Sequence, residues 1–244
     1  REEPIVQELA TEYLTEQGIT ILNNVTLDSV SNDSNKPVIK ANNQNYTFDA
    51  VLYATGRKAN TANIGLEHTD IVTNERGAIV VNDTCESSVP GVYAVGDVNG
   101  GPQFTYVSLD DFRIVFGALT GNSQYTLKDR KNIPYTTFLT PPLSRVGLTE
   151  EDAINQGYTI KTKEMLVATM PRAHVNDYLK GAFKIVVDAE NDLILGATLY
   201  SQGAEELINL IKMAMDNNIP YTYFKNQIFT HPTMAENLND LCNF

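Results

Sequence analysis

The sequence predicts an α/β region followed by an α+β region, and two observations support this. Apolar runs at 50–54 and 91–95 each lead into a glycine turn, as strands buried on both faces of a parallel sheet do. Beyond about residue 125, strand-like alternation is flanked by helical patterns, which is typical of an α+β layer. The polar stretch 128–131 separates the two regions. A length of 244 residues allows one large domain or two modest ones.

The first predicted element is a helix over 4–17. Apolar side chains recur at helical spacing at Ile5, Leu9 and Tyr13. Pro4 sits where the first turn of a helix tolerates proline, and Gly18 is a C-terminal stop signal.

Short apolar runs follow at 19–22, 25–30 and 38–41. The stretch 31–35 is rich in asparagine, aspartate and serine, which favour turns. These runs therefore predict a strand followed by a hairpin.

The buried strand at 50–54 ends at Gly56, and the strand at 91–95 runs into Gly96-Asp97. A short strand at 79–81 and a helix at 104–119 complete this region. In open α/β sheets ligands bind beyond the carboxyl ends of the strands, so both turns are candidate binding sites.

The C-terminal region combines strands and helices. Thr149 caps a helix that runs to about Gln156. The remaining predicted elements are strands at 136–139, 161–168, 181–188 and 193–200 and an amphipathic helix at 205–215.

Composition excludes several classes of function. The formal net charge of −12 disfavours nucleic acid as a partner, because neutralising phosphates needs clustered cations. The absence of an 18-residue apolar run argues against a membrane protein. Cys85 and Cys242 form no motif for a metal or a redox pair, and so few thiols suit a reducing, cytoplasmic location. Because the chain begins with Arg1, we expect a piece of a longer protein.

Three strings occur in order and carry a resemblance: Ala54-Thr55-Gly56-Arg57, Val95-Gly96-Asp97 and His231-Pro232-Thr233-Met234-Ala235-Glu236. With Pro141-Pro142 and the string at 146–150, they make the chain resemble the C-terminal half of the pyridine nucleotide-disulfide oxidoreductases. This flavoprotein family includes glutathione reductase, dihydrolipoamide dehydrogenase and mercuric reductase.

The resemblance implies remnants of two Rossmann-like domains and a complete α+β dimerisation domain. Residues 1–57 correspond to the end of the NAD(P)-binding domain, 58–131 to the end of the FAD-binding domain and 132–244 to the dimerisation domain. No GxGxxG motif occurs in the chain, so its family's pyrophosphate-binding turns are absent. We therefore expect this polypeptide alone to be inactive.

The resemblance also implies FAD-binding residues. In the family, the aspartate matched by Asp97 accepts hydrogen bonds from the ribityl hydroxyls, which suits an acceptor-only carboxylate. The helix that follows turns its N-terminus toward the flavin, where its dipole favours negative charge on the reduced ring. The residues assigned to FAD are Gly96, Asp97, Gln103, Phe104, Thr105 and Tyr106. The alternative is that 103–119 is only a packing helix.

Two further residues are assigned to the nucleotides by the resemblance. Gly56 ends its strand where a bulkier residue would block the approach of a dinucleotide to the backbone. Val25 is placed against the adenosine of NAD(P)H, although a packing role in a strand is an equally good interpretation.

His231 and Glu236 are the predicted catalytic pair. An imidazole can shuttle protons near neutral pH, and a carboxylate on its other nitrogen fixes the tautomer. By the resemblance, the pair reaches the disulfide of the other subunit, so the site needs a homodimer. The His231-Pro232 peptide bond is often cis in this motif.

The substrate class follows from the same resemblance. The stretch 231–241 is most similar to a bacterial branch proposed to reduce hypothiocyanous or hypochlorous acid, so a small disulfide or oxidant is expected. Mercuric reductases commonly have tyrosine in place of this histidine and a C-terminal cysteine pair, which argues against mercury. The alternatives are a cofactor-free dimerisation or interaction module and a dihydrolipoamide dehydrogenase.

Overall fold

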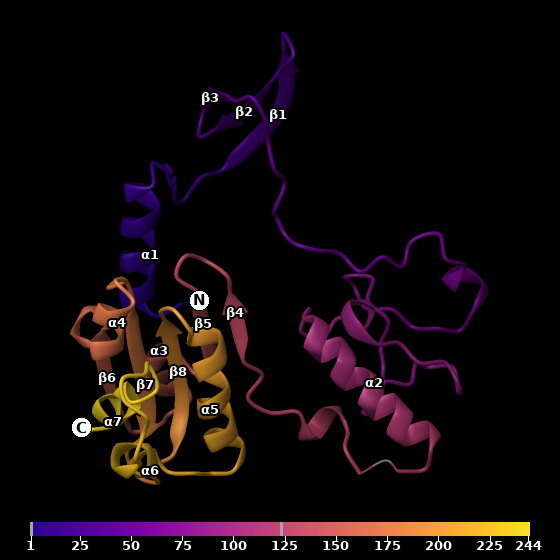
Figure 1. The fold of residues 1–244 in the computed structure, drawn as a ribbon. Coiled ribbons are helices and arrows are strands. Elements are labelled where there is room, and N and C mark those ends of the chain that lie inside the picture. Colours follow the sequence, from indigo (N-terminus) through magenta and orange to yellow (C-terminus); the bar gives the residue numbers. More distant parts are fainter. Residues whose placement is uncertain (1, 123) are drawn as a thin grey trace. The chain divides into compact units, whose positions relative to one another are not determined.

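The computed structural model describes residues 2–122 and 124–244, which form two compact units (Figure 1). One unit joins the described residues up to Ile21 with Lys131–Phe244, and the other is Leu22–Arg130. The boundary between the two units at Arg130 and Lys131 lies in the polar stretch 128–131. The N-terminal helix therefore belongs to the same unit as the C-terminal residues.

The C-terminal unit is built on a five-stranded antiparallel sheet in the order β4-β5-β8-β7-β6. Its strands are β4 Tyr135–Thr137, β5 Leu143–Gly147, β6 Ile160–Leu166, β7 Ala182–Asp188 and β8 Ile194–Tyr200. The four strands predicted in this region are confirmed, with ends that differ by up to two residues. The sequence did not predict β5, because Arg145 and Gly147 interrupt its apolar pattern.

Six α-helices accompany this sheet in the described part of the chain: α1 Pro4–Glu16, α3 Glu150–Asn155, α4 Pro171–Val175, α5 Ala204–Asp216, α6 Tyr221–Asn226 and α7 Asn237–Leu241. The three predicted helices, α1, α3 and α5, are confirmed. The Asp152 N–H donates to Thr149 Oγ1 at 3.0 Å and the Thr149 N–H donates to Asp152 Oδ2 at 3.3 Å, which completes the predicted cap. The others are too short for a helical period to show in the sequence.

The main core lies between the sheet and helices α5 to α7. Phe183 and Ile185 of β7 are buried in one cluster with Ile208 and Ile211 of α5. Because side chains alternate along a strand, Lys184 points to the opposite face. That face of the sheet is covered by α1 and by the start of α3.

Lys184 is the buried centre of an ion cluster. Its Nζ lies 3.0 Å from Glu3 Oε2, 2.6 Å from Glu150 Oε2 and 3.0 Å from Glu164 Oε1, and the Lys184 side chain is 5% exposed. Burial acts to lower the pKa of Lys184, but the hydrogen bonds to the three carboxylates outweigh it and raise this pKa. The cluster ties the N-terminal segment to the sheet. Tyr13 of α1 adds a second tie, since its hydroxyl accepts the Gly181 N–H at 2.9 Å.

The other unit contains an antiparallel hairpin sheet and one long helix. The strands are β1 Leu27–Asp33, β2 Lys36–Ala41 and β3 Gln44–Thr47, and the helix is α2 Thr105–Leu119. The predicted hairpin and the predicted helix at 104–119 are confirmed. The hairpin turn lies at Ser34 and Asn35, which both adopt positive φ.

Four predicted strands are not formed. In the predicted strand 79–81 only Ile79 pairs, through an isolated bridge to Thr73. The segments 19–22 and 50–54 contain no strand, and Leu52 is 89% exposed. In 91–95 only Tyr93 pairs, through an isolated bridge to Glu86. A parallel strand buried on both faces needs a strand on each side and covering helices, and the described residues form only two antiparallel sheets. The mixture of helices and strands is as predicted, whereas a parallel sheet is not formed here.

Candidate functional site

His231 and Glu236 lie in the segment between α6 and α7 and contact each other. His231 Nδ1 lies 2.8 Å from Glu236 Oε2, so the predicted contact between the two side chains is present. The other carboxylate oxygen, Oε1, accepts the Thr233 N–H at 3.1 Å. One carboxylate therefore holds both the ring and the loop that carries it. The His231-Pro232 peptide bond is cis.

The loop is anchored at several points. Thr233 Oγ1 donates to the Thr230 carbonyl at 2.7 Å and accepts the Glu236 N–H at 3.2 Å. The buried Asn237 donates from Nδ2 to the Thr233 carbonyl at 3.2 Å. Leu238 of α7 is 1% exposed in the main core. These contacts anchor the loop that carries the His231 side chain.

The electrostatics of the pair favour a defined tautomer. The hydrogen bond with His231, aided by the Thr233 N–H, lowers the pKa of Glu236 below its ordinary value, so this carboxylate is ionised at neutral pH. An ionised carboxylate only accepts hydrogen bonds, so Nδ1 is the donor and carries the proton. In the neutral ring Nε2 is then an acceptor. The His231 side chain is 68% exposed, which lets Nε2 meet a group that approaches from outside the protomer.

The Gly96-Asp97 turn and the Gly56 turn meet in the other unit. Asp97 lies in a 3-10 helix, Gly96–Asn99, and its Oδ2 lies 3.1 Å from Arg57 Nη1. The Asp97 side chain is 47% exposed. Sequence reasoning placed both turns at candidate binding positions, and the ion pair brings them together.

Buried Asp111 supports this turn from α2, and sequence reasoning missed it. Its Oδ2 accepts the Gly96 N–H at 2.7 Å and Asn99 Nδ2 at 2.9 Å. Its Oδ1 pairs with Arg130. The available signal was a pair of acidic residues within an otherwise apolar helix pattern, followed by an arginine in the polar stretch 128–131.

Of the residues 103–106, predicted to start a helix, only Thr105 and Tyr106 lie in α2. Phe104 is the residue before the first helical position, and its ring stacks on that of Tyr106 with centroids 5.0 Å apart. Burial raises the pKa of Tyr106. Gln103 and Thr105 are exposed.

Gly56 and Val25 are not brought together. Gly56 adopts φ +117°, a conformation that favours glycine. Apart from its chain neighbours, no described residue lies within 4 Å of the position that a Cβ of Gly56 would take. Val25 lies just before β1 and is 40% exposed.

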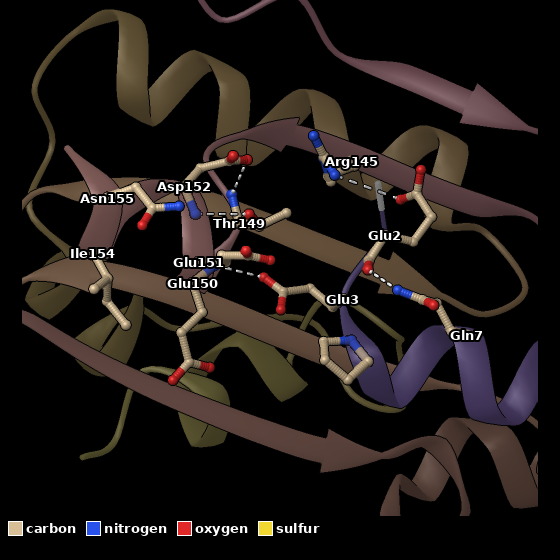
Figure 2. Close-up of a pocket in the computed structure, with 11 residues that line it drawn as sticks. Glu2, Glu3, Gln7, Arg145, Thr149, Glu150, Glu151, Asp152, Ile154 and Asn155 are labelled. Atoms are coloured by element: carbon tan, nitrogen blue, oxygen red, sulfur yellow. Dashed lines mark hydrogen bonds and ion pairs between the residues drawn. The ribbon is translucent and has the colours of Figure 1, made fainter.

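A pocket of about 560 Å³ lies beside the start of α1 and α3 (Figure 2). Figure 2 shows Glu3 directed at the backbone of Glu150, and Glu3 Oε1 accepts the Glu150 N–H at 2.8 Å. Glu2 Oε1 accepts the Tyr135 hydroxyl at 2.6 Å, and Glu2 Oε2 lies 3.8 Å from Arg145 Nη1. The acidic side chains that line the pocket at its α1 end therefore act as links within the fold.

Neither cysteine forms a disulfide, and both are buried. Burial raises the pKa of Cys85 to about 11 and that of Cys242 to about 12. The described residues contain no group of three or more His, Cys, Asp or Glu side chains arranged to hold a metal ion. In the described part of the chain, every helix is too short or too polar to cross a lipid bilayer.

Comparison with protein families gives two matches. Residues 1–111 match the family model described as pyridine nucleotide-disulphide oxidoreductase. Residues 133–242 match the model of the dimerisation domain of the same family.

Individual relatives agree with the family matches. The chain is 42% identical over 241 residues to "Probable pyridine nucleotide-disulfide oxidoreductase RclA" of Escherichia coli (strain K12), an alignment that covers 99% of this chain and 55% of RclA. It is 34% identical over 240 residues to a mercuric reductase of Staphylococcus aureus, covering 97% of this chain and 44% of the relative. The chain thus spans about half the length of the curated relatives it matches.

A solved structure is similar over the same range. The "HOCl-induced flavoprotein disulfide reductase RclA from Escherichia coli" matches with a TM-score of 0.95 and 42% identity, covering 99% of this chain and 56% of that chain. The same relative has also been solved as a Cu(II) complex.

Proposed function

The chain belongs to the pyridine nucleotide-disulphide oxidoreductases, and from this premise we propose that it contributes the acid/base histidine and part of the flavin site of an NAD(P)H-dependent disulfide oxidoreductase. The observation that carries the proposal is the 2.8 Å contact between His231 Nδ1 and Glu236 Oε2 on an exposed, anchored loop. The resemblance predicted from the sequence motifs is confirmed at the level of the family.

The proposed organisation follows the family matches. Residues 1–57 are assigned to the NAD(P)-binding domain, 58–131 to the FAD-binding domain and 132–244 to the dimerisation domain. The last assignment is supported by the match over 133–242. Packing in this chain adds one refinement, because α1 is tied to the sheet of the dimerisation domain through Glu3 and Lys184.

FAD and NAD(P)H are the cofactors of the related flavoprotein reductases. When bound, FAD supplies the redox relay between NAD(P)H and a disulfide. The residues of this chain fit that group. The exposed Asp97 carboxylate offers acceptors for hydroxyl groups, the start of α2 offers a positive helix dipole, and the backbone at Gly56 is open to a close approach. Gly96, Gln103, Phe104, Thr105 and Tyr106 complete the proposed flavin surface, and Val25 is proposed to contact NAD(P)H.

We propose that the reactive cysteine pair lies outside this chain. Cys85 and Cys242 are unpaired, buried and held protonated by their raised pKa values, so neither suits a nucleophilic thiolate. The two free thiols also suit the reducing environment of the cytoplasm, where we place the protein.

His231 is proposed to move protons for the thiols. With Glu236 holding Nδ1–H, Nε2 can take a proton from an attacking thiol and return it to the leaving thiolate. The His231 side chain is 68% exposed, so a homodimer would let Nε2 meet the cysteine pair of a second copy. The substrate is proposed to be a small disulfide or an oxidant such as hypochlorous acid.

The test is a substitution series in the protein expressed from its complete coding sequence. We expect the purified protein to bind FAD and to reduce a disulfide or hypochlorous acid with NAD(P)H. His231→Gln should lower kcat by about 10²–10⁴-fold, the usual contribution of general acid–base catalysis. His68→Gln changes an exposed histidine that matches no motif and should leave kcat unchanged. A colourless protein, or a His231→Gln variant as active as the wild type, would refute the proposal.

A further inference from the structure

One buried carboxylate fixes the Gly96–Asn99 turn. Asp111 in α2 is 1% exposed, and its Oδ2 accepts hydrogen bonds from both ends of the turn, Gly96 N–H at 2.7 Å and Asn99 Nδ2 at 2.9 Å. Asn99 Oδ1 in turn accepts the Gly101 N–H at 3.0 Å. One carboxylate oxygen of Asp111 therefore holds both ends of the turn.

Arg130 supplies the counter-charge that a buried carboxylate needs. Its Nη2 pairs with Asp111 Oδ1, and its Nε lies 2.7 Å from Asp110 Oδ2. The Arg130 side chain is 11% exposed and that of Asp110 is 19% exposed, so this pairing is weakly screened by solvent. Asp110 shares the guanidinium, but its described contacts do not include the turn.

The turn sits tightly on α2, which makes its position sensitive to that helix. Gly96 has φ +73°, and a Cβ at this position would lie 2.8 Å from Ser108 Oγ of α2. Asp97 is the next residue, so a displacement of the Gly96 N–H also displaces the Asp97 carboxylate. The same helix begins at Thr105, so a shift of α2 would move both the Gly96–Asn99 turn and residues 105–106 of the proposed flavin surface.

We propose that Asp111 is a positioning residue for FAD, which holds the turn so that Asp97 can accept hydrogen bonds from the ribityl hydroxyls. This inference rests on the proposed function, because it takes Asp97 as a flavin ligand. Asp111 acts through the turn and does not touch the cofactor.

The test compares Asp111→Asn with Asp110→Asn in the protein expressed from its complete coding sequence. An amide has one acceptor oxygen, so in the first variant an NH₂ group faces either Arg130 or the turn. Loss of one hydrogen bond to a charged group should raise the Kd for FAD about tenfold. We also expect a changed visible circular dichroism spectrum of the flavin at saturating FAD.

Asp110→Asn is the matched control. It changes the same charge one residue away and weakens the same guanidinium pairing, but leaves both hydrogen bonds to the turn. Its Kd for FAD should change by less than about threefold, and its flavin spectrum should equal that of the wild type. Equal effects of the two substitutions on Kd and spectrum would show that Asp111 only stabilises the fold, and would overturn the inference.

Two further outcomes are separable. A wild-type protein that takes up no FAD would refute the proposed function itself. If Asp111→Asn does not fold, Asn99→Ala removes the second donor to Asp111 from a less buried position, together with the contacts of Asn99 to the Ala94 carbonyl and the Gly101 N–H. This variant should bind FAD at least about threefold more weakly, and an unchanged Kd would overturn the inference.

Discussion

Replacing Glu236 with glutamine tests how the catalytic pair works. In the structure Oε2 contacts His231 Nδ1 at 2.8 Å, and Oε1 accepts the Thr233 N–H at 3.1 Å. Both contacts need an acceptor on the residue-236 side chain. A glutamine provides one acceptor oxygen and one NH₂ group, so it can accept a hydrogen bond from only one of the two donors.

Each orientation of the new amide has a distinct consequence. If its oxygen stays on His231, the NH₂ group faces the Thr233 N–H and the loop loses an anchor. If the amide turns round, Nδ1 becomes an acceptor and the ring proton moves to Nε2. Nε2 is the nitrogen proposed to take a proton, so this tautomer cannot act as the base.

The size of the effect follows from one hydrogen bond to a charged group, about 1.5–3 kcal/mol. Since about 1.4 kcal/mol corresponds to a tenfold change in rate, the range is roughly 10- to 100-fold in kcat. The imidazole is 68% exposed, so solvent can replace part of the lost contact. We therefore expect a decrease of about 10- to 30-fold.

The assay is the steady-state rate of disulfide reduction by the flavin-loaded, complete protein. Asp240→Asn is the control, because Asp240 is an exposed carboxylate of α7 close in sequence to Glu236. It should retain the wild-type kcat, and both variants should retain their flavin. A Glu236→Gln protein within twofold of the wild type would refute the tautomer argument.

Three further predictions concern pH and stability. The hydrogen bond with His231 lowers the pKa of Glu236, so the ionised contact stabilises the native state above the ordinary carboxyl pKa and is lost as pH falls through the lowered value. NMR should therefore show that the contact persists at the ordinary glutamate pKa and is lost only at lower pH, and loss at or above the ordinary value would contradict this. Lys184→Met leaves the buried Glu3 carboxylate without its counter-charge and should cost about 3–5 kcal/mol in denaturant unfolding. Lys212→Met, at a partly exposed pair on one helix, should cost less than about 1 kcal/mol, and equal costs would contradict the cluster's role. Gly181→Ala places a Cβ 1.8 Å from a carbonyl oxygen and should lower the thermal midpoint more than Gly157→Ala, whose Cβ meets nothing within 4 Å; the opposite order would count against the packing described.

The elements that the sequence predicted are those whose signals lie within their own residues. In α5 the buried side chains recur at helical spacing, so the period shows the buried face. In β7 all seven residues are buried, and the apolar run is visible in spite of Lys184. The hairpin was predictable because Ser34 and Asn35 mark its turn.

The features that the sequence did not predict correctly depend on contacts with residues distant in the chain or on neighbouring strands. The run at 50–54 is apolar enough for a buried strand, but no strand of the described chain pairs with it. Asp111 was missed because its partners are a backbone N–H 15 residues earlier and a guanidinium 19 residues later. No sequence period reports such contacts. His231 and Glu236 were found because a motif marked them together.

The most direct test of the central claim is a double-mutant cycle on His231 and Glu236. The measurement is kcat for disulfide reduction by the wild-type protein, His231→Gln, Glu236→Gln and the double variant. If the carboxylate acts through the imidazole, Glu236→Gln will lower kcat in the wild-type background and have no further effect in the His231→Gln background. Losses that multiply in the double variant would show that the two residues act independently and would contradict the account.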